Sequence, residues 1–377
     1  MVNFFAPINY LGYGIHSYNT IKAYYDNFNK NVSLIPPFGQ TQWRDKYIDE
    51  WLSNRKKISS KDIGIMIFNE PFLSQFSGST RIGFPVFEME KFTELNKVMM
   101  RSCDHLFTPS QWAKEIIKQE VGNIGVDVIP EGYDPLIYHP RYSLNYKLNR
   151  IEEEGLYFVH VGKWEERKGT KDILTTFLDA FHSKKIKVTL IIKAENMFNP
   201  NWQKEIIDFL PFGSYKSNQG EIIYACDNVT VNVLAPAHRT FKEIADLYRR
   251  ADFGIWLSKA EGWNLPLMEC IACGTPAITT SWTGMSEYMS GYPEELKITD
   301  FKSIIANDGQ WFHGDKGEWK TPALDQVRAI LEAIAFDPEK YLLYENKCMR
   351  SIENFTWENA AKKMQEALKK LGGCDDM

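Results

Sequence analysis

Short apolar segments alternate with amphipathic stretches along the first part of the chain. Short apolar runs bounded by turn residues predict buried strands, and an apolar stripe at helical spacing predicts a helix. Ser110 is placed to cap a helix over residues 111–119. A helical stripe is formed by Ile15, Tyr18, Ile21 and Tyr25. Strands are predicted at residues 3–6, 63–68, 82–87, 106–108 and 126–129.

The same alternation resumes after residue 154. Residues 170–181 carry an apolar helical face, and residues 139–154, with several Asn, Arg and Glu, are interpreted as a linker. Repeated strand–helix units on both sides of a linker predict an α/β protein with two doubly wound domains. The last helix has a stripe of Ala360, Met364, Ala367, Leu368 and Leu371. Further strands are predicted at residues 156–161, 188–192, 229–234, 253–257 and 277–280.

Composition narrows the class of protein. A length of 377 residues suits two or three domains, and no run of 18 apolar residues predicts a membrane-spanning helix. The net charge of −5 argues against general nucleic-acid binding. The first residues lack a basic flank and a long apolar core, so they predict a strand rather than a signal peptide. We expect a reduced, cytoplasmic protein, with peripheral attachment to a membrane left open.

The most informative stretch is Glu261-Gly-Trp-Asn-Leu-Pro-Leu-Met-Glu269, which runs from a loop into a helix between two predicted strands. Asn264 is predicted to cap this helix and Pro266 to lie in its first turn, which leaves backbone N–H groups free to bind phosphate. Carboxylates are good acceptors for sugar hydroxyls. The stretch therefore indicates a sugar-nucleotide site. The alternative is that both glutamates are ordinary loop and helix-surface residues.

This stretch, followed by Ala-Cys-Gly-Thr-Pro at 272–276, resembles the signature of retaining glycosyltransferases of family 4, which have the GT-B fold. The resemblance implies two Rossmann-like domains that face each other across a cleft. It predicts an acceptor-side domain at residues 1–145, completed by a final helix at 356–372, and a nucleotide-sugar domain at residues 154–355. By the resemblance, Glu261 contacts the donor sugar and Glu269 the ribose hydroxyls. The loop that binds sugar and phosphate consists of Gly262, Trp263, Asn264 and Leu265.

A basic loop follows the strand at 156–161. Lys163, Arg167 and Lys168 are suited to bind a diphosphate and to stabilise the charge that grows on it during transfer. In family 4 an arginine usually occupies the position of Lys163. Lysine keeps the positive charge of the arginine but cannot bind phosphate in a bidentate manner. Lys168-Gly169 matches the family pattern. The alternative is a solvated basic turn.

A second set of candidates lies in the first domain. Gly12 and Gly14 resemble the glycine-rich loop through which the backbone approaches the donor phosphate, although a simple tight turn is an alternative. Many family members place a histidine on the acceptor side, where this chain has Glu88. We predict that Glu88 orients the acceptor hydroxyl, with Asn69 and Glu70 behind it; the alternative is that Glu88 and Glu70 are surface carboxylates at strand ends.

The resemblance predicts a hexosyltransferase-type enzyme with no cofactor besides its substrate, a UDP- or GDP-linked sugar, and with a glycan or lipid-linked acceptor. No metal is predicted at the site, because the chain shows no Asp-x-Asp clamp and its histidines lack metal-ligand spacing. Glu287 is predicted either to line the phosphate side of the cleft or to face solvent. A catalytically silent sugar-nucleotide-binding subunit and a sugar-nucleotide epimerase of the same fold remain alternatives.

Overall fold

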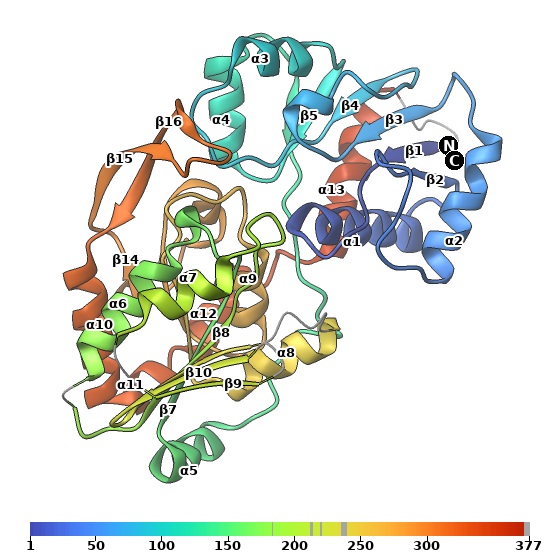
Figure 1. Cartoon of the computed structure of the whole chain (residues 1–377). Coiled ribbons are helices and arrows are strands. Elements are labelled where there is room, and N and C mark those ends of the chain that lie inside the picture. Colours follow the sequence, from blue (N-terminus) through green and yellow to red (C-terminus); the bar gives the residue numbers. More distant parts are fainter. Residues whose placement is uncertain (183, 212–213, 219–220, 235–239, 373–377) are drawn as a thin grey trace.

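The protein is described by a computed structural model that covers residues 1–182, 184–211, 214–218, 221–234 and 240–372 (Figure 1). Its two large sheets lie in different parts of the molecule and are each flanked by helices (Figure 1). We call the sheet formed by the first strands the front sheet and the other the back sheet.

The front sheet has six parallel strands in the order β2-β1-β3-β4-β5-β6. Its strands are β1 (Val2–Phe5), β2 (Val32–Ile35), β3 (Ile63–Met66), β4 (Arg81–Gly83), β5 (His105–Thr108) and β6 (Val126–Val128). The predicted strand at 82–87 ends early at Gly83, and Pro85, which has no N–H to donate to a ladder, lies in the loop that follows. The helices that accompany the front sheet are α1 (Gly12–Asn27), α2 (Lys46–Ser53), α3 (Glu94–Arg101) and α4 (Gln111–Glu120).

The predicted linker contains a helix. Ser143 accepts a hydrogen bond from the backbone N–H of Tyr146 and so caps α5 (Leu144–Glu154). Lys147 on α5 is buried and donates to the carbonyl of Gly274 at 2.7 Å and to Glu345 at 3.1 Å. These contacts hold α5 against the helices of the back sheet, which is why this polar stretch is ordered.

The back sheet has eight strands in the order β14-β13-β12-β7-β8-β11-β10-β9. They are parallel except that β10 runs antiparallel to both of its neighbours. The strands are β7 (Leu156–Val161), β8 (Val188–Lys193), β9 (Ser214–Asn218), β10 (Glu221–Cys226), β11 (Val229–Val233), β12 (Phe253–Trp256), β13 (Ala277–Thr280) and β14 (Lys297–Ile298). The sequence did not predict β9, β10 and β14, which lie at or next to the sheet edges. Strand β14 has only two residues and β9 is polar, whereas β10 is a largely apolar segment that was missed.

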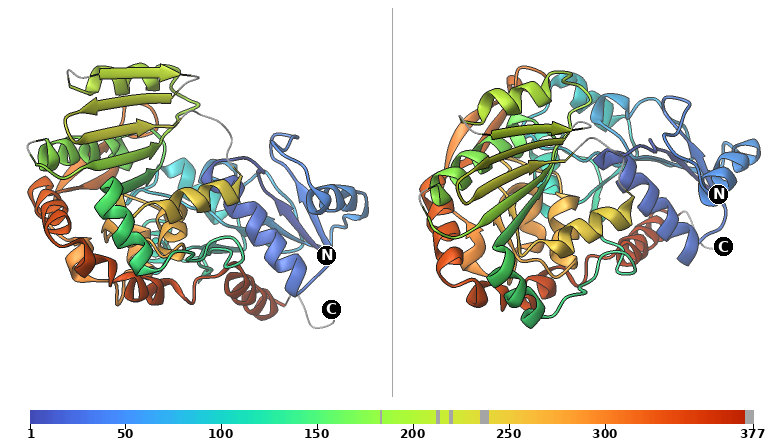
Figure 2. Two further views of the ribbon diagram at one scale, coloured as in Figure 1. Left: turned by 90° about the horizontal axis from the view of Figure 1, so that it is seen from below. Right: turned by 60° about the horizontal axis from the view of Figure 1, so that its bottom comes forward.

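Helices cover both faces of the back sheet, and the last helix leaves it. The helices are α6 (Thr170–Phe181), α7 (Trp202–Phe209), α8 (Phe241–Arg250), α9 (Leu265–Ala272), α10 (Leu324–Phe336), α11 (Pro338–Leu342), α12 (Glu345–Ile352) and α13 (Trp357–Lys370). Figure 2 shows α13 beside α1, where the Tyr24 hydroxyl is 2.9 Å from Gln365. A Cβ atom on Gly132 would lie 2.4 Å from the backbone at Thr356. Glycine at position 132 therefore lets the chain before α13 pass close to the front part. None of the described helices has the length and apolar character needed to cross a membrane.

A hairpin also joins the two parts of the molecule. It consists of β15 (Phe301–Asn307) and β16 (His313–Pro322) and lies toward α3 and α4 in Figure 1. Its Trp319 and Phe312 are buried in one apolar cluster with Phe87 and Phe92 of the front part. The backbone N–H of Glu90 donates to the carbonyl of Lys316 at 3.2 Å. The hairpin therefore fastens the back sheet to the loop after β4.

Candidate active site

The stretch from Glu261 to Glu269 forms the loop after β12 and most of α9, as its pattern predicts. The predicted cap is wrong in one respect. Asn264 precedes the helix with left-handed backbone angles (φ 78°, ψ 65°), and its side chain accepts no hydrogen bond from α9. It points instead toward Met285, whose sulfur lies 3.3 Å from the side-chain nitrogen. The first helical bond of α9 is from the N–H of Met268 to the carbonyl of Asn264, so the amides before it have no partner within the helix.

Glu261 lies at the centre of a buried ion network. Its two carboxylate oxygens are 2.7 and 2.8 Å from Nζ of Lys168, and Oε2 is also 2.8 Å from Nη1 of Arg167. Burial by itself raises the pKa of this carboxyl, but the adjacent Lys168 and Arg167 outweigh burial and lower the pKa to about 2. Glu261 is only 3% exposed, so these two cations keep its charge stable away from water.

Arg167 connects this network to the front part. Its guanidinium is buried and lies 2.7 Å from Glu165, 3.3 Å from Glu88 and 2.8 Å from the carbonyl of Ala260. The sequence identified Arg167 only as one of three loop cations, and the family pattern singles out Lys168 beside it. No periodicity or spacing distinguishes two adjacent cations, so the central role of Arg167 in this network is visible only in the structure.

Lys163 lies at the edge of the network. Its Nζ is 2.9 Å from Glu165, whose other oxygen binds Arg167, and about a third of its side chain is exposed. Lys163 therefore does not contact Glu261, in contrast to Lys168. A polar pocket of about 430 Å³ opens beside Glu165 and is bounded by Trp164, Glu166, Thr170, Lys171, Asn196, Asn199, Glu205, Asn307, Asp308 and Gln310.

The acceptor-side candidates differ in position. Glu88 is close to Arg167 and, because of burial, has a raised pKa that Arg167 only partly offsets. Glu70 is buried, and burial raises its pKa to about 7. Asn69 is exposed and stands at the start of a single 3₁₀ turn over Glu70–Phe72. Of the three residues, the structure brings only Glu88 into contact with the Glu261 network.

The glycine-rich loop meets the loop after β4. A Cβ atom on Gly14 would lie 2.0 Å from the carbonyl oxygen of Asn9, so only glycine fits this start of α1, whereas Gly12 faces open space. The Tyr13 hydroxyl donates to the carbonyl of Val86 at 2.6 Å and accepts from its N–H at 2.9 Å. On the opposite side, a Cβ atom on Gly262 would be 2.5 Å from Val86. The loops after β1, β4 and β12 therefore converge on Val86.

Glu269 lies in a different environment from Glu261. It is buried on α9, 3.5 Å from the Tyr248 hydroxyl, and no cation accompanies it among the interactions of the described residues. Burial raises its pKa to about 8, although hydrogen bonds from Tyr138 and Tyr248 act in the opposite direction. At neutral pH this carboxyl is therefore mainly protonated in the ligand-free protein.

The remaining predicted residues are buried or contact the front part. Trp263 is buried against Tyr288 and Phe355, with ring centroids 5.2 and 5.5 Å apart, and Leu265 is also buried. Glu287 is half-buried and contacts the front part. Its carboxylate accepts a 2.7 Å hydrogen bond from the backbone N–H of Gln111, at the start of α4. It therefore compensates the positive end of a front-part helix.

Comparison with known proteins agrees with this architecture. The family described as "Family 4 Glycosyltransferase in conflict systems" matches residues 215–364. No curated protein sequence is significantly similar to the chain. The family match confirms the predicted resemblance to family 4 glycosyltransferases.

Several solved structures are similar over nearly the whole chain. Sucrose-phosphate synthase from Thermosynechococcus elongatus has a TM-score of 0.66 at 14% identity, and the match covers 99% of both chains. HepE of Anabaena, in complex with UDP and glucose, has a TM-score of 0.62 at 14% identity, with 98% and 99% covered. A trehalose-6-phosphate synthase studied for glycosyl transfer with retention has a TM-score of 0.56 at 12% identity, with 93% and 86% covered. These similarities confirm the predicted α/β GT-B fold.

Proposed function

We propose that this protein is a retaining glycosyltransferase that moves a sugar from a nucleoside diphosphate-sugar, UDP- or GDP-linked, to an acceptor hydroxyl. The observation that carries the proposal is the buried Glu261, held ionised by Lys168 and Arg167 and connected through Arg167 to Glu88 on the front part. A buried charge network is costly to maintain for stability alone and is typical of a functional site.

The presence of two sheets supports separate roles for the two parts of the chain. We propose that residues 1–145 together with the helix at 356–372 form the acceptor side, and that residues 154–355 form the donor side. The position of α13 against α1 supports the first assignment. The HepE structure contains UDP and glucose, which supports a UDP-sugar as the first donor to test.

Each charged residue has a separate proposed role. Lys168 has three N–H donors, and its contacts with Glu261 leave at least one to bind the donor diphosphate. Arg167 is already engaged by three carboxylates and one carbonyl, so it positions Glu261 and Glu88 rather than binding phosphate. Glu261 then lies where it can accept a hydrogen bond from the donor sugar.

In the proposed reaction the bond between the anomeric carbon and the diphosphate oxygen breaks as the acceptor oxygen bonds to the same face of that carbon. The negative charge that grows on the leaving diphosphate is stabilised by Lys168 and by the amides before α9. The acceptor proton passes to the diphosphate, and Glu88 orients the acceptor hydroxyl. No side-chain nucleophile and no metal ion takes part in this scheme.

The test starts with donors. Thermal melting in the presence of UDP-, GDP-, ADP- and dTDP-sugars identifies the nucleotide, because a ligand that binds the folded state raises apparent stability. Turnover of that donor with and without an acceptor mixture, and the anomeric configuration of the product, then test the reaction.

We expect the wild type to turn over the donor. Glu261→Gln should lose this turnover, and the exposed control Glu294→Gln should retain it. Inversion at the anomeric carbon would refute the retaining mechanism. Binding without any turnover would favour the catalytically silent subunit. Isomerisation of the donor in the absence of acceptor would favour the epimerase.

A further inference from the structure

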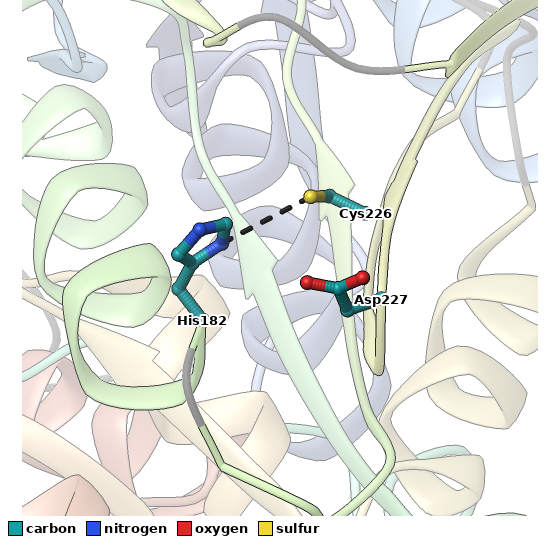
Figure 3. Close-up of side chains that lie close together, drawn as sticks. All are labelled: His182, Cys226 and Asp227. Carbon is teal, nitrogen blue, oxygen red and sulfur yellow. Dashed lines mark hydrogen bonds between the residues drawn. The ribbon is translucent and has the colours of Figure 1, made fainter.

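Three side chains of metal-binding types gather at the end of α6, away from the ion network (Figure 3). His182 immediately follows α6, Cys226 is the last residue of β10, and Asp227 lies in the turn before β11. Their potential ligand atoms all lie within 4.8 Å of one another, and Cys226 Sγ is 3.9 Å from His182 Nδ1. Elsewhere in the described part of the chain, no such group of three His, Cys, Asp or Glu side chains occurs.

Backbone contacts hold these three residues in place. The N–H of His182 donates to the carbonyl of Leu178 at 2.9 Å, so this residue continues the last turn of α6. Cys226 pairs with Val229 across the β10–β11 hairpin, and Asp227 has the positive φ of 51° that a tight hairpin turn requires. The neighbouring Asn228 side chain donates to the carbonyl of Lys184 at 2.9 Å and so ties the turn to the segment after α6.

The chemistry and spacing of the three ligands suit zinc. A tetrahedral zinc ion with a Zn–S bond of about 2.3 Å and a Zn–N bond of about 2.0 Å separates sulfur from nitrogen by roughly 3.5 Å. The observed Cys226–His182 distance of 3.9 Å is close to this value, so small side-chain rotations suffice. A thiolate with an imidazole favours zinc over calcium or magnesium, which prefer oxygen ligands alone.

The surroundings permit a cation to enter. His182 and Asp227 are exposed and Cys226 is half-buried, so the ligand atoms are accessible. Lys184, the lysine nearest in sequence to His182, has its Nζ 3.4 Å from Glu332 on α10 and is thus paired away from the group. With three protein ligands, the fourth position of a tetrahedral ion is left for water.

We propose that His182, Cys226 and Asp227 bind one zinc ion that fastens the end of α6 to the β10–β11 hairpin. The group lies at the starts of β8 and β11, since Val188 pairs with Val229. The Lys163–Lys168 loop follows the opposite, carboxyl end of the neighbouring β7. The ion therefore lies at the other end of the back sheet from the proposed sugar-transfer site, and the inference does not depend on the proposed function. His182 and Cys226 are 44 positions apart, so their spacing along the chain gives no sign of the site.

The experiment uses the full chain, stripped of metal and kept reduced. Cobalt(II) titration should give the near-ultraviolet charge-transfer absorption of a thiolate–cobalt bond, and zinc should displace the cobalt with a stoichiometry of one. Cys226→Ser should abolish the charge-transfer band. His182→Ala and Asp227→Asn should each weaken zinc binding by at least on the order of tenfold to a hundredfold, because the loss of a partner outside the ligand set already costs that much.

Two exposed residues outside the group provide matched controls. His313→Ala and Asp325→Asn remove the same ligand types and should leave zinc affinity unchanged. Zinc should also raise the melting temperature of the wild type and not that of Cys226→Ser. Any of three results would overturn the proposal: a cobalt band that persists in Cys226→Ser, equal zinc affinities in all variants, or no saturable zinc binding by the wild type.

Discussion

Replacing the two glutamates of the 261–269 stretch by glutamine is expected to change stability in opposite directions. The two residues are both buried, but only Glu261 is accompanied by cations. Its folded-state pKa of about 2 lies below the ordinary value, so its charge stabilises the folded protein above the unfolded-state pKa. That stabilisation is lost as the pH falls toward the folded-state pKa. At about 1.36 kcal/mol per pKa unit, the contribution at pH 7 is about 3 kcal/mol.

The pKa of Glu269 is shifted in the opposite direction, so its effect on stability has the opposite sign. Its folded-state pKa of about 8 is raised, so folding keeps a proton that the unfolded chain releases at neutral pH. The protein therefore loses stability as the pH rises from the unfolded-state pKa to the folded-state pKa. Between pH 4 and pH 7 this loss is about 3 kcal/mol. Glutamine never ionises, so Glu269→Gln should be more stable than the wild type at pH 7 by about that amount.

The assay is urea unfolding of the wild type and both variants at pH 7, 4 and 3, with the exposed Glu294→Gln as control. For Glu261→Gln, the deficit should shrink from about 3 kcal/mol at pH 7 to about 1.5 kcal/mol at pH 3. For Glu269→Gln, the gain should disappear by pH 4. A loss of stability for both variants at pH 7, or differences that do not depend on pH, would refute the electrostatic argument.

Other predictions concern turnover. Lys168→Ala should lower turnover by roughly tenfold to a hundredfold, the worth of a charge-assisted hydrogen bond, and unchanged steady-state kinetics in a folded variant would exclude Lys168 from the site. Glu88→Gln should lower kcat while calorimetry shows unchanged donor affinity; weaker donor binding with normal kcat would contradict an acceptor-side role. Glu269→Gln should mainly raise the donor KM, because a ribose contact is the same in ground and transition states, and a fall in kcat alone would argue against that contact. Turnover should survive chelator treatment even where zinc removal lowers the melting temperature, and recovery of lost turnover on adding Mg²⁺ would contradict the metal-free mechanism.

The sequence predicted most strands of the two parallel arrays but none of the antiparallel strand pairs. The strands at 156–161 and 277–280 have the predicted bounds, because β-branched and apolar residues bounded by turn residues favour a buried strand. The hairpin at 301–322 and strand β10 were not predicted. Their stability comes from cross-strand pairing and, in the hairpin, from the insertion of Trp319 into the front cluster rather than from local periodicity.

The sequence by itself determined the repeated strand–helix units of both parts, the Glu261–Glu269 stretch and the basic loop, because apolar periodicity and turn residues act over a few neighbouring positions. Only the tertiary structure decided that Arg167 joins Glu261 to Glu88, that the pKa values of two glutamates eight positions apart are shifted in opposite directions, and that His182 lies beside Cys226. The physical reason is that Coulomb attraction, desolvation and ligand geometry depend on distances in space, and the fold sets those distances between residues that are far apart along the chain.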